Sequence, residues 1–414
     1  MLQFDFGYHF AYFASIERLT QTAMDFEPVA RVEATRREFR NWLGAHRRTV
    51  SEWMALRHSS DTRARVEFLR QWQQALQSER WVAVHFPEEV GGRNASLLEH
   101  LAVQQELARA EAPPLINGAA VSIFAPTLLV FGTAEQRQRY LPPLLRAEEL
   151  WCLGFSEPNA GSDLASLRTR AERQGEVFVV SGQKVWTTYA NQADYGLFLV
   201  RTNPRAPAHK GISCLILAMR SPGVTVRPLR EITGDTDFNE VFLENVRVPA
   251  ANLVGELDKG WEVILTALGH ERGTLLLVDH VRRRAELEEL HRWLRHTGKS
   301  EDPLVRQRFA EFCTEVAVMG LHGLRLVSDL EHGRTPTDVS VLKLYGSELA
   351  QRFLDFALTV QGPYAQLWRG DERVLRDGAW QHAWLMARAM TIASGTSEIQ
   401  RNIIAQRLLG LPRA

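Results

Sequence analysis

The chain has 414 residues, and its 49 Lys and Arg balance 49 Asp and Glu, so the formal net charge is zero. This length exceeds what one ordinary hydrophobic core needs and predicts two or three domains. The charge balance disfavours a protein that binds nucleic acid or an anionic membrane surface, although a local basic patch could still bind a phosphorylated cofactor. We therefore expect no nucleic-acid partner.

The cysteines and the hydropathy of the chain indicate the cellular compartment in which the protein is expected. The first residues lack the basic-then-apolar order of a signal peptide, because Asp5 and Glu17 interrupt it. The longest apolar runs, such as 212–219, fall far short of the ~20 residues that span a bilayer. The sequence thus predicts a soluble, cytoplasmic protein with no membrane span. Three widely separated cysteines form no C-x-x-C pair, and we expect buried single thiols in a reducing compartment: Cys152, Cys214 and Cys313.

Residues 28–150 are predicted to form a helical domain, after an N-terminal extension at 1–27 whose role the sequence leaves open. Apolar residues recur at helical spacing in 32–43 and again in 97–110, with charged residues on the other face. Proline and glycine mark the joints between these segments.

Residues 151–258 change to a strand-like pattern. Segments 177–180 and 184–188 read as a hairpin around Ser181 and Gly182. Several short strands at such spacing predict a small barrel or sandwich. The further strand-like runs are 195–200, 212–219, 224–229 and 240–248.

Residues 259–414 return to the helical period. One predicted helix face carries Ile264, Leu268, Glu271, Leu275 and Val278. The order helical, strand, helical predicts an α+β protein of three domains. Further helices are expected at 304–331, 338–360, 379–392 and 397–409.

Two short motifs are suited to a planar ligand. The segment 154–163, G-F-S-E-P-N-A-G-S-D, combines small residues that permit a close backbone approach with the hydroxyls of Ser156 and Ser162. Trp186, Thr187 and Thr188 offer an aromatic face and two hydroxyls at the end of a predicted strand. Each motif also has an ordinary interpretation, the first as a surface loop with a helix cap and the second as a strand with a core Trp.

Two further positions carry charge or backbone donors. Glu271 falls on the apolar stripe of its helix, where a carboxylate is costly to desolvate unless it is paired. Arg272 points about 100° away along a helix of 3.6 residues per turn, so it is not an ideal partner. Gly395 and Thr396 open the last predicted helix and could present N–H groups to an anion. The alternatives are a solvated Glu271 at a domain seam and a capping box that uses Glu398.

Joined in this order, the segments resemble the acyl-CoA dehydrogenase family over residues 28–412. The resemblance implies an N-terminal helical domain at 28–150, a middle β domain at 151–258 and a C-terminal four-helix bundle at 259–414, with FAD as cofactor and no metal. Its anchors are W-C-L-G-F-S-E-P at 151–158, G-Q-K-V-W-T-T at 182–188, F-N-E-V-F at 238–242, Gly260-Trp261 and G-T-S-E-I-Q-R-N-I-I at 395–404.

The resemblance also assigns roles by matching positions. Ser162 would meet the pantetheine arm of the CoA ester, and Arg272 matches an Arg at the CoA channel. The cofactor contacts would come from Leu153, Phe155, Ser156, Trp186, Thr187, Thr188, Thr396 and Glu398.

The chain departs from the family pattern in two places. Ser394 replaces the usual catalytic Glu, and in a minority of the family the base instead occupies the helix position that Glu271 holds here. The Ser394 backbone N–H could still polarise a thioester carbonyl, since that contact needs no side chain. The R-x-x-F-G segment that meets the FAD diphosphate is missing, and a Gly-Gly pair is only Gly362-Pro363.

These points predict an enzyme that converts an acyl-CoA to a trans-2-enoyl-CoA, with Glu271 as the base for the α-proton and flavin N5 as the hydride acceptor. An electron-transfer flavoprotein would accept the electrons. The resemblance favours a homodimer or homotetramer and leaves a heteromer open. The alternatives are a supporting subunit of a heteromeric dehydrogenase and a flavin oxidase or monooxygenase on the same fold. The acyl group stays undetermined.

Overall fold

The computed structural model describes residues 30–57, 59, 61–331 and 339–412, without the side chains of 268–277, 327 and 330–331. The N-terminal extension at 1–27 lies outside this range. The described chain divides into two compact units, one made of residues 30–38, 97–109, 275–331 and 339–412, and one made of the described residues of 39–96 and 110–274. We call them the bundle unit and the sheet unit. Helix α1 (Ala30–Ala45) contributes residues to both.

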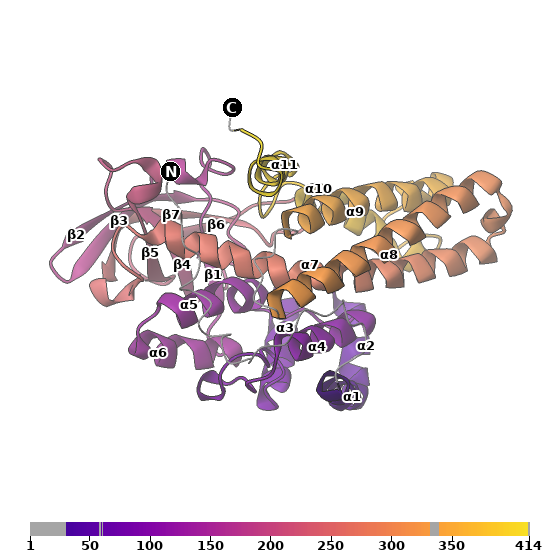
Figure 1. Ribbon diagram of the computed structural model, residues 1–414, viewed down its shortest axis with the longest axis horizontal. Coiled ribbons are helices and arrows are strands. Elements are labelled where there is room, and N and C mark those ends of the chain that lie inside the picture. The colour runs from indigo at the N-terminus through magenta and orange to yellow at the C-terminus, as the bar shows by residue number, and fades with distance from the viewer. Residues whose placement is uncertain (1–29, 58, 60, 332–338, 413–414) are drawn as a thin grey trace. The chain divides into compact units, whose positions relative to one another are not determined.

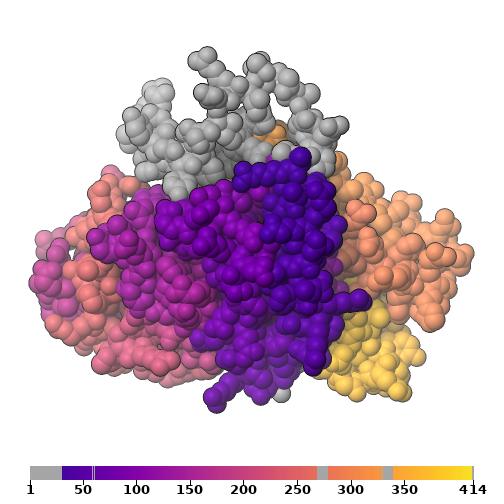
Figure 2. Space-filling view, turned by 90° about the horizontal axis from the view of Figure 1, so that it is seen from below, coloured from indigo at the N-terminus to yellow at the C-terminus, as the bar shows by residue number. Residues whose placement is uncertain are grey.

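The sheet unit begins with helices, two of which start at a residue whose side chain caps them. The Asp61 carboxylate accepts the Ala64 N–H at the start of α3, and Thr133 forms a capping box with Gln136 at the start of α6. Gln136 also donates to the carbonyls of Ala251 and Leu253, 2.8 Å away in each case, and so ties α6 to the end of the sheet. In Figure 2 the part of the chain that carries these helices is coloured indigo to purple, and the part that carries the strands is coloured magenta. The helices are α2 (Arg47–Leu56), α3 (Thr62–Ser78), α5 (Ala125–Phe131) and α6 (Ala134–Leu145).

An eight-stranded sheet follows these helices in the same unit (Figure 1). Its strand order is β6-β7-β3-β2-β4-β5-β8, with β1 pairing parallel to β4. One face packs into a core of buried apolar residues that includes Phe178, Phe198 and Leu215. The strands are β1 (Trp151–Gly154), β2 (Arg170–Gln174), β3 (Val177–Lys184), β4 (Tyr195–Arg201), β5 (Ile212–Ala218), β6 (Val224–Pro228), β7 (Asn239–Pro249) and β8 (Leu253–Val254).

The expected hairpin around Ser181 and Gly182 is wrong. β3 runs without a turn through both residues, and the hairpin instead joins β2 to β3 at Gly175, whose φ of 61° suits a tight turn. The register of β3 against β7 shifts between Val180 and Gly182, which marks a bulge. Glycine is needed here for close approach, because a Cβ at Gly182 would lie 2.4 Å from Thr169 Oγ1. Gly182 therefore allows close packing beside the bulge and does not form a turn.

The bundle unit consists of long helices around one apolar core (Figure 1). Core side chains come from four helices in the C-terminal part of the chain and from Leu101 on α4 (Leu97–Arg109). The expected order of helical, sheet and helical regions is therefore confirmed. The four helices are α7 (Gly260–His296), whose first part belongs to the sheet unit, α8 (Pro303–Glu331), α9 (Val339–Gln361) and α10 (Ala379–Met390); the shorter α11 (Ser397–Ile403) follows.

The cysteines only partly match the prediction. Cys152 and Cys214 are buried, and burial raises the pKa of each thiol to about 12. Cys313 is instead exposed, on α8. Within the described part of the chain, no helix is long and apolar enough to cross a membrane.

Candidate functional site

The residues expected at the site fall in both units, and each unit is described separately. Glu271 and Arg272 belong to α7, but their side chains lie outside the described part, so their roles stay predictions. The bundle unit contains Ser394, Thr396 and Glu398. The remaining expected residues lie in the sheet unit: Leu153, Phe155, Ser156, Ser162, Trp186, Thr187 and Thr188.

The sheet unit brings two of the expected segments together. We call two short segments the aromatic platform: Phe155 with Ser156, and Trp186 with Thr187 and Thr188. The Val185 N–H donates to the Ser156 carbonyl at 3.0 Å. Lys184 Nζ donates to the Phe155 carbonyl at 3.0 Å. The 154–163 motif and the Trp-Thr-Thr motif, separated in sequence, are therefore direct neighbours in space.

Trp186 lies just beyond β3, not on a strand as expected, because the strand ends at Lys184. Its backbone is left-handed, with φ 60°, the residue is 60% exposed, and its ring makes a T-shaped contact with Phe238 at a centroid distance of 6.0 Å. A left-handed backbone costs a bulky residue about 1–2 kcal/mol, and an exposed indole regains little of this by burial. Such a side chain is better placed to contact a planar ligand than to stabilise the fold.

The turn that carries Trp186 is held by neighbouring backbone groups. The Thr187 N–H donates to the Asn239 carbonyl, and Asn239 Nδ2 donates back to the Thr187 carbonyl, both at 3.0 Å. The Tyr189 N–H donates to the Asp237 carbonyl at 2.8 Å. These bonds fix the peptide planes on both sides of Thr188, so the ring of Trp186 is presented from a rigid base.

The polar groups of the platform separate into two kinds. Thr187 is fully buried, and its hydroxyl has no hydrogen-bond partner among the described residues. Ser156 and Thr188 are half-buried, as is Phe155 beside Ser156. An exposed indole together with two half-buried hydroxyl residues fits the ring system of a flavin, which is apolar on its faces and polar at one edge.

Sequence reasoning missed Lys184 and Glu157. Lys184 is fully buried, and its Nζ lies 2.9 Å from Glu157 Oε1. Glu157 also accepts the N–H groups of Arg168 at 2.7 Å and Thr169 at 2.8 Å. Alternation along β3 could have found Lys184, because it shares the parity of the buried residues Phe178 and Val180.

Burial and ion pairing shift the pKa values of Lys184 and Glu157 in opposite directions. Burial lowers the pKa of Lys184 to about 8, although the Glu157 carboxylate opposes that shift. Burial would raise the pKa of Glu157, but the Lys184 charge and the hydrogen bonds that it accepts outweigh burial and lower the pKa. The pair is therefore ionised at neutral pH.

The bundle unit holds the Ser394 segment in an unusual backbone conformation. Ser394 and Gly395 both have positive φ, 54° and 90°. Lys343 Nζ donates to the Gly395 carbonyl at 2.6 Å, and Gln400 Nε2 donates to the Ser394 carbonyl at 3.0 Å. Because the opposite edge of a peptide plane carries the N–H group, fixing these carbonyls also fixes the direction of the donors that follow them.

Thr396 caps helix α11, since its hydroxyl accepts the Ile399 N–H at 3.2 Å. Hydrogen bonds from the N–H of Glu398 itself and from the Thr396 hydroxyl lower the pKa of the exposed Glu398 carboxyl. This part of the segment is thus organised as a helix start. The cofactor contacts that the resemblance assigns to Thr396 and Glu398 stay predictions.

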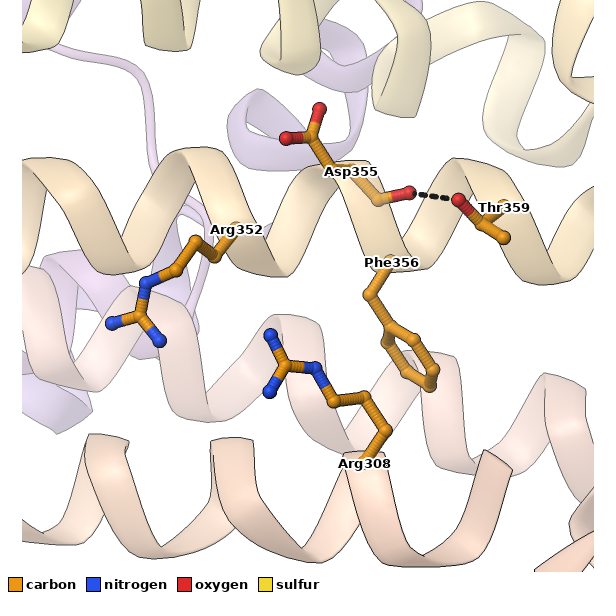
Figure 3. A pocket seen from close by; sticks show the side chains of 5 residues that line it. All are labelled: Arg308, Arg352, Asp355, Phe356 and Thr359. Carbon is orange, nitrogen blue, oxygen red and sulfur yellow. Dashed lines mark hydrogen bonds between the residues drawn. The ribbon is translucent and has the colours of Figure 1, made fainter. Parts of the chain in front are cut away.

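A surface groove of about 290 Å³ lies elsewhere in the bundle unit, on α8 and α9 (Figure 3). Its arginines are already paired, Arg308 with Glu311 at 2.6 Å and Arg352 with Glu315 at 2.8 and 2.5 Å. None of the expected site residues lines it. Its lining is Arg308, Arg352, Asp355, Phe356 and Thr359.

Comparison with known proteins identifies the family. The acyl-CoA dehydrogenase N-terminal, middle and C-terminal domain models match residues 34–148, 152–246 and 258–409. Acyl-CoA dehydrogenase IpdE1 of Mycolicibacterium smegmatis is 36% identical over 395 residues, which cover 92% of this chain and 98% of that protein.

Two solved structures extend the match to the fold. The structure named "Crystal structure of the ChsE4-ChsE5 complex from Mycobacterium tuberculosis" has a TM-score of 0.83 at 32% identity, covering 94% of this chain and 100% of the other. "Tcur3481-Tcur3483 steroid ACAD" has a TM-score of 0.83 at 30% identity, with the same coverage. The chain therefore belongs to the acyl-CoA dehydrogenase family of oxidoreductases.

Proposed function

We propose that this chain binds FAD and removes the α and β hydrogens of an acyl-CoA thioester to give a trans-2-enoyl-CoA. The observation that carries the proposal is Trp186, a half-exposed indole held in a left-handed turn beside Phe155 and Ser156. When bound, FAD would supply the hydride acceptor that this reaction needs. Members of the family generally use this cofactor.

The cofactor would be held mainly by the aromatic platform. Trp186 and Phe155 would pack on the apolar ring, and the hydroxyls of Ser156 and Thr188 would hydrogen-bond its polar edge. Leu153 and Thr187 would support these residues from within the sheet unit. Thr396 and Glu398 would add contacts from the bundle unit.

The chemistry on the substrate would be performed by residues around Glu271. We assign Glu271 as the base that removes the α-proton, because Ser394 occupies the position of the usual catalytic Glu. The Ser394 N–H would donate to the thioester carbonyl and so stabilise the developing negative charge on oxygen. Ser162 and Arg272 would bind the CoA portion.

The substrate class follows from the relatives only as a proposal. Because one similar structure is named a steroid ACAD, we propose a bulky polycyclic acyl group for this chain as well. A panel of straight-chain, branched and steroid-derived acyl-CoA esters, each added anaerobically to the FAD-loaded protein, would test it. Loss of the oxidised-flavin absorbance with the steroid-derived ester supports the proposal, and bleaching by straight chains alone contradicts it.

Replacing Glu271 with Gln tests the base. Glu271→Gln keeps the shape of the side chain and removes its basicity, so we expect flavin reduction to slow by at least about 100-fold while FAD stays bound. Stopped-flow absorbance measures the reduction rate. The matched variant Glu262→Gln, an exposed position on the same helix, should keep the normal rate. Near-normal reduction by Glu271→Gln would rule out the assignment.

A second function is favoured by two sequence departures. The chain lacks the R-x-x-F-G segment and has Gly362-Pro363 in place of a Gly-Gly pair, and a similar structure is named as a complex of two different chains. The alternative is that this chain is one subunit of a heteromer and does not complete a flavin site alone. A colourless protein that turns yellow only with a partner chain would favour this alternative.

The electron acceptor separates dehydrogenase from oxidase. We propose an electron-transfer flavoprotein as the acceptor, so the reduced protein should reoxidise slowly in air and rapidly with that partner. Rapid reoxidation by oxygen would instead favour the oxidase or monooxygenase function on the same fold.

A further inference from the structure

Lys184 is a buried cation at the junction of the two segments of the aromatic platform. Its side chain is fully inaccessible, and a buried ammonium is costly unless it is paired and hydrogen-bonded. Nζ meets both conditions, since it lies 2.9 Å from Glu157 Oε1 and 3.0 Å from the Phe155 carbonyl. Both partners belong to the loop that follows β1.

Glu157 extends this junction to a third segment. Its two carboxylate oxygens accept the N–H groups of Thr169 and Arg168, at 2.8 and 2.7 Å. The backbone of Glu157 also pairs with Ala160 through two bonds of 3.0 Å, which closes the loop. One carboxylate therefore connects the loop, the start of β2 and the end of β3.

Lys184 is close in the chain to the residue proposed to contact the flavin. Trp186 is two residues further on, and the intervening Val185 N–H donates to the Ser156 carbonyl. On the other side the turn is held by Asn239 through Thr187. The loop and the turn are thus joined at successive residues, and Lys184 provides the two charge-assisted bonds.

We propose that Lys184, through its pair with Glu157, is a positioning residue that holds Phe155 and Ser156 against the Trp186 turn and so sets the environment of the flavin. This inference rests on the proposed function, because it assumes that the platform contacts FAD. Neither Lys184 nor Glu157 is assigned any direct contact with cofactor or substrate.

The pH dependence distinguishes positioning from simple stabilisation of the fold. The groups facing Lys184 are Glu157 on the loop, Arg201 on β4 and Cys214 on β5. Burial lowers the pKa of Lys184 to about 8, from an ordinary value of 10.5. Between these values the folded chain binds fewer protons than the unfolded chain, so this group adds to the free energy of unfolding as pH rises. Lys184 loses its charge above pH 8 while Glu157 stays ionised, so the ion pair is lost. We therefore expect the platform to change above pH 8 without unfolding of the protein.

The test compares Lys184→Met, Lys184→Arg and Glu157→Gln with the wild-type protein in its native assembly. The FAD dissociation constant, the visible flavin spectrum from pH 6.5 to 10 and the thermal unfolding midpoint are measured for each. We expect Lys184→Met and Glu157→Gln to weaken FAD binding at least about tenfold, the scale of one charge-assisted hydrogen bond. Lys184→Arg should recover most of the affinity. The spectral change of the wild type near pH 8 should be absent from both Lys184 variants.

Val248→Ala controls for a general loss of stability. Val248 is a buried core residue of the same strand pair, near the end opposite Lys184. The proposal is overturned if Val248→Ala weakens FAD binding as much as Lys184→Met does. It is also overturned if Lys184→Met binds FAD with the affinity and pH profile of the wild type.

Amide hydrogen exchange on the FAD-free chain provides a readout that is independent of the cofactor. The amides of residues 155–157 and 185–188 should exchange at least about tenfold faster in Lys184→Met than in wild type. Unchanged exchange overturns the positioning role. If no assembly of the wild type binds FAD, the proposed function fails by itself, and the exchange result still decides whether Lys184 holds the platform.

Discussion

At the scale of single residues, Trp186 and Trp72 show two opposite uses of the same side chain. Trp72 is 1% exposed and belongs to the core of the sheet unit, whereas Trp186 is 60% exposed on a left-handed turn. Burial stabilises the first, while the backbone of the second opposes folding. The two residues therefore contribute to different properties of the protein, one to its stability and one to its ligand contacts.

Replacing each tryptophan should separate these properties. Trp186→Gly relieves a left-handed backbone worth about 1–2 kcal/mol and loses an edge-to-face ring contact worth about 0.5–1.5 kcal/mol. The free energy of unfolding should therefore change by less than about 1 kcal/mol, while FAD retention falls. Trp72→Ala should cost about 3–5 kcal/mol. Denaturant titration measures both values, and a large loss of stability in Trp186→Gly would contradict this view of the residue.

Residue identities predicted part of the site. The motifs at 154–163 and 186–188 were expected to serve one ligand, and the structure places them side by side. The left-handed backbone of Trp186 was not predictable, because it depends on Asn239 and Asp237, which lie about fifty residues away in the chain. Lys184 was overlooked for a related reason, since its partner Glu157 belongs to another segment.

At the scale of secondary structure, the spacing of apolar residues predicted the helices more accurately than the strands. Expected helices at 304–331 and 338–360 correspond to α8 (Pro303–Glu331) and α9 (Val339–Gln361). Long amphipathic helices can be recognised from the sequence alone, because the spacing of their apolar residues repeats at every turn. The hairpin error arose where one glycine was interpreted locally, although Gly182 is required by Thr169 on the adjacent strand-forming segment. Tertiary packing, and not turn chemistry, decides that position.

The bulge between β3 and β7, whose extra residue lies on β7 opposite the step from Val180 to Gly182, should be sensitive to a single carbon added at Gly182. A Cβ at Gly182 would lie 2.4 Å from Thr169 Oγ1 and 2.6 Å from its Cα, so the backbone has to move. We expect Gly182→Ala to lower the free energy of unfolding by about 1–3 kcal/mol. Gly161→Ala is the matched control, because nothing lies within 4 Å of its added Cβ, and its effect should stay within about 0.5 kcal/mol. Equal effects of the two variants would mean that the bulge tolerates a side chain.

At the scale of the whole molecule, the proposed binding of FAD requires groups that hold its diphosphate. A buried diphosphate needs donors or cations, and the segment that usually supplies them is absent from this sequence. The domain limits expected at 150 and 258 likewise stay a prediction. The family relationship, in contrast, rests on matches to all three domain models.

Assembly should therefore control cofactor occupancy. If a neighbouring subunit completes the diphosphate site, FAD binds the assembled form more tightly and stabilises that form by mass action. We expect a dimer or larger oligomer, homomeric or heteromeric, whose dissociation on dilution releases FAD. Light scattering with and without added FAD, combined with flavin fluorescence, measures both quantities. A monomer that keeps full FAD occupancy at nanomolar concentration would contradict the shared-site hypothesis.

The composition of the bundle unit has a consequence during synthesis on the ribosome. Leu101 of α4 packs into a core whose other members lie between Leu287 and Ala387. At translation rates of about 5–20 residues per second, the ribosome needs on the order of tens of seconds to synthesise the residues that pack against Leu101. During that interval the nascent chain exposes a surface that chaperones bind. The yield of folded protein in a cell should therefore depend on the concentration of chaperones, even if the folded protein itself has a high free energy of unfolding.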